Sequence, residues 1–273
     1  MKSILLSCYV VVIWGVSCKS NTVSGTKLVD ATVVDGNMSE ELGGTVMLYL
    51  NDSPCTAQHI GGGYLLTAAH CVIIGGKGDR PSLRIRHAGG FYLMSLEPHE
   101  YEEIRPAATE TSEMTAGNRT FKIPIPDLSI IRPKAEDNIA MLSALRKYDL
   151  TVNILNEQQE GVFIAGYGRT SYDNSSPIDG NLRVGPAVVS NVEANTYQIF
   201  WRQGDGLTGA TSGDSGGPLF TNADDKLLLY GVASNIIRKK NDSGSTELVW
   251  AQYTRLDTFP VRDWIKEKTG IIY

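Results

Sequence analysis

The segment TSGDSGGPLF, residues 211–220, places Ser215 among closely spaced glycines. A serine in such a run is either a turn residue that hydrogen-bonds locally or a nucleophile. Residues 213–217 formally satisfy G-x-S-x-G, the nucleophile elbow of α/β-hydrolases, in which the catalytic histidine follows the serine. Here every histidine precedes Ser215, so the order of residues excludes that class.

A serine nucleophile would need one of the four histidines as its base, and these are His59, His70, His87 and His99. His70 has the most unusual surroundings, because it follows the run GYLLT and two alanines and directly precedes Cys71. Small neighbours let the imidazole pack closely, and a disulfide from Cys71 would hold the loop that carries the base. The other three lie in turn-like or strand-edge contexts and are interpreted as structural or surface histidines.

The elements that must position these residues are short β-strands. Runs rich in Val, Ile, Leu, Tyr and Phe, such as TVMLYL and GVFIAGYG, recur between Gly, Pro and Asn/Asp turn signals. This pattern predicts an all-β sandwich or barrel. Two helices are expected: a weak one around AMLSALRKY, and one over DTFPVRDWIKEKTG with Asp257 or Thr258 as N-cap, Pro260 in the first turn and Gly270 as stop.

The first 20 residues, MKSILLSCYVVVIWGVSCKS, contain one early lysine and then an uncharged stretch over residues 3–18. This is short for a membrane span and typical of a signal peptide. We therefore expect export, to the periplasm, the outer membrane as a lipoprotein, or the extracellular space. GVSC at residues 15–18 resembles a bacterial lipobox, although Gly15 stands where leucine is usual; membrane attachment is expected only with lipidated Cys18, and the leader favours a bacterial protein.

Composition limits the partners. The chain has 273 residues, 42% hydrophobic, which is enough for a substantial core. Its net charge of −5 and pI near 5.4 argue against nucleic acid. Without the leader, Cys55 and Cys71 form an even pair in an oxidising compartment, which predicts one disulfide worth about 3 kcal/mol. No metal-site spacing is recognisable, and no cofactor is expected.

Two six-residue strings, LTAAHC at residues 66–71 and GDSGGP at residues 213–218, resemble the signature segments of the chymotrypsin-like (trypsin-type) serine proteases. Cys55 and Cys71 match the family's disulfide around the catalytic histidine, GYG at residues 166–168 resembles its GWG, and WAQYTRL resembles its PGVYTRV. The resemblance covers nearly all of the chain after the leader. It implies two packed six-stranded antiparallel β-barrels with a C-terminal α-helix.

The domain boundaries follow from this resemblance and from the polar stretch RKYDLTVNILNEQQEG, which separates two sets of strand runs. We assign residues 1–18 to a signal peptide, 19–32 to a propeptide or linker, 33–147 to an N-terminal β-barrel, and 148–273 to a C-terminal β-barrel with the helix. The first barrel would carry His70 and Asp127, and the second would carry Ser215.

The resemblance also implies a third catalytic residue, a carboxylate between His70 and Ser215. DLSIIRP, which begins at Asp127, resembles the family's DIALL segment, a buried aspartate opening an apolar strand. Asp137 in EDNIAML is the alternative, but it lies too close to the GYG segment. We therefore assign the triad to His70, Asp127 and Ser215, with the backbone N–H groups of Gly213 and Ser215 as the oxyanion hole.

Activation of such proteases follows cleavage before an Ile-Val-Gly-Gly-like start, whose new ammonium pairs with the aspartate beside the catalytic serine, here Asp214. The best match is VVDG at residues 33–36, which requires cleavage after Thr32 and makes Val33 the new terminus. Asp35 replaces a glycine, and no basic residue precedes the cut. Cleavage after Lys27 is the alternative.

The primary specificity pocket is assigned by position before and after Ser215. Its base falls near Gly209, where the absence of an aspartate argues against a preference for Lys or Arg. Bulky residues in the walls would shorten the pocket, which resembles the elastase pattern. This predicts a preference for substrates with small or medium aliphatic side chains before the scissile bond. Thr211 stands where a cysteine is common, so a familiar pocket disulfide is missing. The expected walls are Ser234, Asn235, Ile236 and Ala251.

Three functions are weighed. The first is an exported serine endopeptidase acting on protein or peptide substrates, with protein protease inhibitors as further partners. The second is a catalytically silent binding or regulatory module on the same fold, and the third is a secreted lectin-like or adhesin β-protein. Only the first predicts covalent labelling of Ser215 by an organophosphorus probe.

Overall fold

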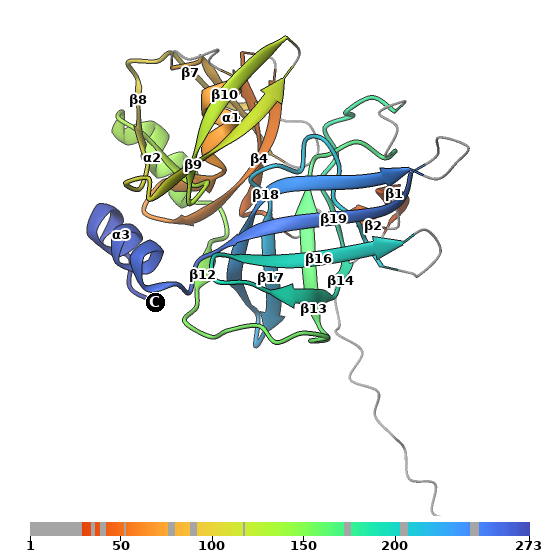
Figure 1. The fold of residues 1–273 in the computed structure, drawn as a ribbon. Helices are drawn as coiled ribbons and strands as arrows, with labels where there is room; N and C mark the ends of the chain where they lie inside the picture. Colours follow the sequence, from red (N-terminus) through yellow and green to blue (C-terminus); the bar gives the residue numbers. More distant parts are fainter. Residues whose placement is uncertain are drawn as a thin grey trace, which may run out of the picture.

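The structure, a computed structural model, has two large β-sheets and a separate two-stranded hairpin among its described residues. Figure 1 shows that the two large sheets are curled, and buried apolar side chains form the core. It describes residues 29–33, 36–38, 42–51, 53–75, 80–87, 92–116, 118–171, 176–202, 207–240 and 246–273. Within these ranges, three helices lie outside the sheets. The expected all-β double barrel of the chymotrypsin type, with a C-terminal helix, is confirmed. The expected six strands in each barrel are not, because the two large sheets contain seven and ten strands among the described residues.

The first sheet forms because its strands place apolar residues on one face. In β6, for example, Leu83 and Ile85 are buried whereas Arg84 and Arg86 are partly exposed, the alternation expected of a half-buried strand. The strand order is β7 (Tyr92–Leu96), β6 (Leu83–Arg86), β3 (Thr45–Leu50), β4 (Ser53–Gly61), β5 (Tyr64–Thr67), β11 (Ser129–Pro133) and β8 (Tyr101–Ile104). A separate hairpin is formed by β9 (Glu110–Ala116) and β10 (Arg119–Ile125).

The second sheet contains ten strands among the described residues. Its order is β1 (Val29–Val33), β2 (Gly36–Met38), β14 (Arg183–Ala187), β13 (Val162–Gly166), β17 (Pro218–Ala223), β18 (Lys226–Lys240), β19 (Thr246–Arg255), β16 (Thr196–Arg202) and β15 (Val189–Val192). The short strand β12 (Tyr148–Leu150) runs parallel to β18. Residues 36–38, which the domain assignment placed with the first barrel, pair with β14 and so extend the second sheet.

The C-terminal helix α3 (Phe259–Thr269) has the expected ends. Thr258 is its N-cap residue, a proline lies in its first turn, and Gly270 ends it in the left-handed conformation. Its buried residues Val261, Trp264 and Ile265 join the main apolar core. Figure 1 shows α3 beside the lower end of the first barrel, with the C-terminus next to it.

The weak helix was predicted around AMLSALRKY, and here the sequence interpretation was wrong at both ends. The helix α2 spans Glu136–Ser143, so it starts four residues earlier and stops before Arg146. Glu136 and Asp137 occupy its first turn, where carboxylates favour a helix N-terminus. Tyr148 lies beyond the helix, at the start of β12, where its buried hydroxyl and Thr45 Oγ1 form a hydrogen bond of 2.7 Å.

The remaining helix, α1 (Ala69–Gly75), is a short one that follows β5 directly. Residues of both barrels contribute to the main core, including Leu48 and Leu66 from the first and Phe220 and Leu229 from the second. In the part of the chain described, no helix has the length and apolar character needed to cross a membrane.

Candidate active site

His70 and Asp127 are brought together by two neighbouring strands of the first barrel. His70 follows the end of β5, and Asp127 precedes the start of β11. These strands are antiparallel, with Ser129 opposite Thr67, so the end of one meets the beginning of the other. As a result Asp127 accepts two hydrogen bonds from His70, from the backbone N–H at 2.8 Å and from Nδ1 at 2.7 Å.

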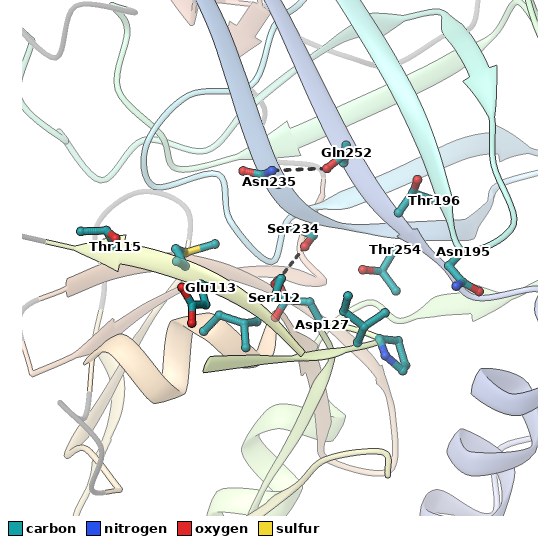
Figure 2. A pocket seen from close by; sticks show the side chains of 14 residues that line it. Ser112, Glu113, Thr115, Asp127, Asn195, Thr196, Ser234, Asn235, Gln252 and Thr254 are labelled. Carbon is teal, nitrogen blue, oxygen red and sulfur yellow. Dashed lines mark hydrogen bonds between the residues drawn. The ribbon is translucent and has the colours of Figure 1, made fainter. Parts of the chain in front are cut away.

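The carboxylate of Asp127 is buried, and protein groups donate hydrogen bonds to both of its oxygens. Ser234, from β18 of the second barrel, donates its hydroxyl to Asp127 Oδ2 at 2.7 Å (Figure 2). Burial opposes ionisation of Asp127, but the adjacent His70 and these hydrogen bonds outweigh it and lower the pKa of the carboxyl. Because a carboxylate only accepts, His70 Nδ1 carries the proton, which leaves Nε2 of the neutral ring as a base.

Ser215 lies in a tight turn before β17, and the glycines around it are required by geometry. Gly213 and Gly216 have positive φ angles of 105° and 82°. A Cβ on Gly216 would lie 2.2 Å from the carbonyl oxygen of Thr56, and one on Gly217 would lie 2.4 Å from that of Ala165. The turn therefore needs both the conformational freedom and the absent side chain of glycine.

Thr56, next to Cys55 on β4, links the Ser215 turn to the first barrel by hydrogen bonds. Its backbone N–H donates to Ser215 O at 2.8 Å, and its hydroxyl donates to Gly213 O at 2.9 Å. The same hydroxyl oxygen accepts the N–H of Tyr167 at 3.1 Å. Sequence reasoning missed Thr56, because nothing in its neighbourhood marks it apart from the adjacent cysteine.

The disulfide Cys55–Cys71 is present, with its sulfurs 2.05 Å apart. Cys71 Sγ lies 3.9 Å from His70 Nε2 and 3.7 Å from Ser215 O, so the base and the serine turn flank the same sulfur. The two cysteines and His70 form a close His/Cys group in the described structure. It offers no thiolate to a metal, because both sulfurs are bonded to each other.

The backbone N–H groups of Gly213 and Ser215 make no hydrogen bond to any described residue. They are thus free to bind an anion at the serine turn, as expected for an oxyanion hole. Ser215 is partly exposed, and within the described residues no hydrogen bond joins its hydroxyl to His70. The structure brings the three proposed triad residues to one site and links two of them directly.

Asp214, beside the serine, is buried without an ion-pair partner among the described residues. Its carboxylate accepts the N–H groups of Gly168 and Thr211, each at 2.7 Å, and the Thr211 hydroxyl at 3.2 Å. Burial raises the pKa of Asp214, because these donors and the charge of Arg183 only partly replace water. A positive charge placed beside Asp214 would therefore favour its ionised form.

The alternative residues of the sequence analysis lie elsewhere. Asp137 is exposed on the first turn of α2, away from His70. His59 is buried, with Nδ1 3.4 Å from Arg146 O, and burial lowers its pKa. His87 contacts Gly43 O at 3.1 Å, and His99 is exposed in a turn. None of these four takes part in the site.

The five residues assigned to the specificity pocket do not line a single cavity. Ser234 and Asn235 face a cavity of about 350 Å³ between the β9–β10 hairpin and β18–β19, which also reaches Asp127 and Glu113 (Figure 2). Gly209 instead lines a much smaller cavity beside Asp214. Ala251 is buried in the core of the second barrel, and Ile236 packs against it and near Trp201.

Val33, the expected new terminus, is the last residue of β1 and pairs with Gly36 of β2 in this uncut chain. Val34 and Asp35 lie outside the described residues, as do the proposed leader, Cys18 and the alternative cut after Lys27. An ion pair between a Val33 ammonium and Asp214 could form only after cleavage. That assignment stays a prediction.

Comparison with protein families identifies the family of this chain. The family model described as Trypsin matches residues 33–265, which include His70, Asp127 and the whole of the Ser215 turn. The match covers most of the chain and agrees with the two curled β-sheets, the C-terminal helix and the disulfide next to His70. The chain belongs to the trypsin family of chymotrypsin-like serine proteases.

Proposed function

We propose that the chain is an exported serine endopeptidase that hydrolyses peptide bonds through Ser215, His70 and Asp127. The observation that carries this proposal is the 2.7 Å hydrogen bond between His70 Nδ1 and Asp127, beside a serine turn with two unused N–H groups. Family membership supports protein or peptide substrates. The proposal also includes the partners and location expected from the sequence, namely protease inhibitors and, with lipidated Cys18, a membrane.

The reaction would proceed in two halves. Ser215 Oγ attacks the substrate carbonyl while His70 Nε2 takes the hydroxyl proton, and Asp127 stabilises the resulting imidazolium. The N–H groups of Gly213 and Ser215 bind the oxyanion, and His70 then gives its proton to the leaving amine. Water, deprotonated by the same imidazole, hydrolyses the acyl-enzyme and returns Ser215 to its starting state.

The protein is proposed to be made as a precursor. Asp214 is buried with a raised pKa, and no ammonium pairs with it in the described part of the chain, which is the condition expected of an uncut chain. The packing of the pocket residues supports the same interpretation, since Gly209 is separated from the cavity that holds Ser234 and Asn235. Cleavage after Thr32 would supply an ammonium to Asp214 and open the primary pocket.

Specificity is proposed to be non-tryptic, for small or medium aliphatic side chains before the scissile bond. Gly209 offers no carboxylate to a basic side chain. Ile236 and Ala251 add bulk to the walls, and both already pack in or against the core of the second barrel. A library of peptide substrates that differ in this one side chain would test the preference, and turnover confined to Lys and Arg would contradict it.

The deciding experiment is labelling with a fluorophosphonate probe before and after limited proteolysis near residues 27–33. Labelling at Ser215 that rises after cleavage, and that is absent from Ser215→Ala, is the expected result. Location is tested separately by finding whether the mature chain begins at Cys18 or beyond it. Folded wild-type protein that does not label in either form would overturn the protease proposal.

A catalytically silent module is the second candidate, because no hydrogen bond joins the Ser215 hydroxyl to His70 in the described structure. Catalytic hydrogen bonds are often loose before substrate binds, so this geometry does not exclude the enzyme. The same labelling experiment separates the two. A silent module would keep the fold and bind peptides without forming a covalent bond at Ser215.

A further inference from the structure

We propose that Arg183 is the internal counter-ion of Asp214 in the uncut chain and that it positions the Ser215 turn before any cleavage. This inference rests on the proposed function, because it concerns how the same catalytic turn is held. Arg183 would be a positioning residue, since it acts through Asp214 and touches no substrate. The uncut chain should consequently possess a basal reactivity of its own.

The sheet brings Arg183 next to Asp214. Arg183 opens β14 and stands opposite Gly166 of β13, and a Cβ on Gly166 would lie 2.1 Å from Asp214 Oδ1. Both charged groups also contact Gly168. Arg183 Nη1 lies 3.5 Å from the carbonyl oxygen of Gly168, and the backbone N–H of Gly168 donates to Asp214 at 2.7 Å. Arg183 and Asp214 line the same small cavity.

The guanidinium of Arg183 is incompletely satisfied where it stands. Its side chain is only 4% exposed, and its buried Nε has no hydrogen-bond partner within the described residues. Nη1 makes two long contacts, to the carbonyl oxygens of Asn181 and Gly168. A buried donor without a partner is costly, so the group would gain by turning toward a carboxylate.

Asp179 competes with Asp214 for this guanidinium. Arg183 Nη2 is paired with Asp179, whose side chain is 36% exposed and can therefore be hydrated without Arg183. Asp214 is fully enclosed, and the charge of Arg183 already favours its ionised form. If the guanidinium turned from Asp179 toward Asp214, water could hydrate the exposed carboxylate of Asp179 while Arg183 paired with the enclosed one of Asp214.

This arrangement suggests how two states of the site could be regulated. In the uncut chain Arg183 is shared between Asp179 and Asp214, so the serine turn is held only part of the time. After cleavage the new ammonium would occupy the place beside Asp214 and hold the turn fully. Cleavage would thus amplify a basal activity.

The test uses the intact chain, verified by mass, and measures the initial rate of fluorophosphonate labelling at Ser215. Arg183→Gln should lower this rate about tenfold, the size of an ordinary coupling between two sites. Arg183→Lys should restore part of it. Asp179→Asn is the matched variant: it breaks the same surface ion pair but frees Arg183 for Asp214, so the rate should rise.

The two substitutions separate positioning from simple stabilisation. If Arg183 only braced the fold through Asp179, Arg183→Gln and Asp179→Asn would lower labelling alike, and the proposal would be wrong. Equal labelling of intact wild type and Arg183→Gln, or no labelling of the intact wild type, would also overturn it. Should Arg183→Gln fail to fold, Asp179→Asn decides alone, because any result other than a rise counts against the proposal.

Cleaved protein distinguishes this inference from the proposed function. Cleaved wild type that does not label would sink the protease assignment itself, whereas cleaved protein that labels while intact Arg183→Gln equals intact wild type would sink only the role of Arg183. Cleaved Arg183→Gln should regain the rate of cleaved wild type, since the ammonium replaces the guanidinium.

A pH profile adds a readout that a structural role would not change. An α-amino group loses its charge near about pH 8, whereas a guanidinium stays charged above about pH 12. The other charged or titratable groups near Asp214 are Asp179, ionised throughout this range, and the buried Tyr253, whose pKa burial raises well above its ordinary value. Labelling of intact wild type should persist to about pH 10, while that of cleaved Arg183→Gln should fall above about pH 8. Parallel profiles would contradict the proposal.

Discussion

The two barrels contribute halves of the site that differ in how completely they are assembled. In the first barrel, Asp127 is buried, accepts hydrogen bonds from His70, and has a lowered pKa. Its carboxylate fixes the tautomer of His70. In the second, the Ser215 turn rests on glycines with positive φ, and Asp214 is buried with a raised pKa. The proposed base is therefore preorganised, whereas the proposed nucleophile lies beside an aspartate that has no direct ion pair within the described residues.

This difference shows where control of the site can be placed. A base held by neighbouring strands and a disulfide resists change, because moving it would break several hydrogen bonds at once. A turn whose buried carboxylate has only a shared counter-ion, as proposed for Arg183, can be shifted by supplying one full charge. The following substitutions test whether the halves differ in this way.

The largest effect is expected at the preorganised base. Asp127→Asn should lower the rate of acylation about 10⁴-fold, because the amide would present a donor to His70 Nδ1 and stabilise the wrong tautomer. The measurement is the rate of labelling or of ester hydrolysis by cleaved protein. Asp137→Asn, an exposed substitution on α2, is the control and should leave the rate unchanged. Equal loss in both variants would contradict the assigned triad.

The next effect concerns the glycine turn. Gly216→Ala should reduce the free energy of unfolding by about 2–5 kcal/mol, since it combines a strained φ with a steric clash. The Cβ would meet Thr56 O and Thr67 Oγ1, each at 2.2 Å. Gly161→Ala has a similar φ of 73° but open space around its Cβ, so it should cost less. Urea unfolding of both variants measures the difference, and equal costs would mean that the close packing is unimportant.

A smaller effect is expected where the barrels meet through Ser234. Ser234→Ala removes the hydroxyl that donates to Asp127 and should slow labelling about tenfold, as loss of a hydrogen bond to a charged group does. Ser190→Ala removes a hydroxyl that donates at 3.0 Å to Gln198 O in the same barrel, away from the site. It should leave labelling intact. Unchanged labelling by Ser234→Ala would show that the first barrel alone positions the base.

The smallest effect is a difference in pH dependence between the two aspartates. Asp127 has a lowered pKa, so its stabilisation is present above its ordinary pKa and is lost as the pH falls through the folded value. Asp214 has a raised pKa, so its contribution is present at low pH and is lost as the pH rises through the folded value. In the uncut chain, we expect the unfolding free energy of Asp214→Asn to increase relative to that of wild type as the pH rises above about 4. Over the same range, the unfolding free energy of Asp127→Asn should decrease relative to that of wild type. Curves parallel to wild type would refute both assignments.

Much of the fold and site could be predicted from local sequence. The segments LTAAHC and GDSGGP pointed to His70 and the Ser215 turn, and the strand pattern pointed to an all-β architecture. The primary pocket was harder, because Gly209, Ser234, Ile236 and Ala251 were assigned by position, whereas their openness depends on how separate strands pack. The end of α2 was also mispredicted, because Tyr148, expected near the helix, instead lies buried in β12.

The sequence by itself determined the chemical groups of this protein: a serine in a glycine turn, a histidine beside a cysteine, and an aspartate that opens a strand. Only the tertiary structure decided which distant groups complete them. Ser234 reaches Asp127 across 107 positions, Thr56 reaches Gly213 across 157, and Arg183 meets Asp214 at Gly168. The physical reason is that residue type sets what a group can donate, accept or attack. Strand pairing sets which groups are close, and burial sets how much each charge needs its partner.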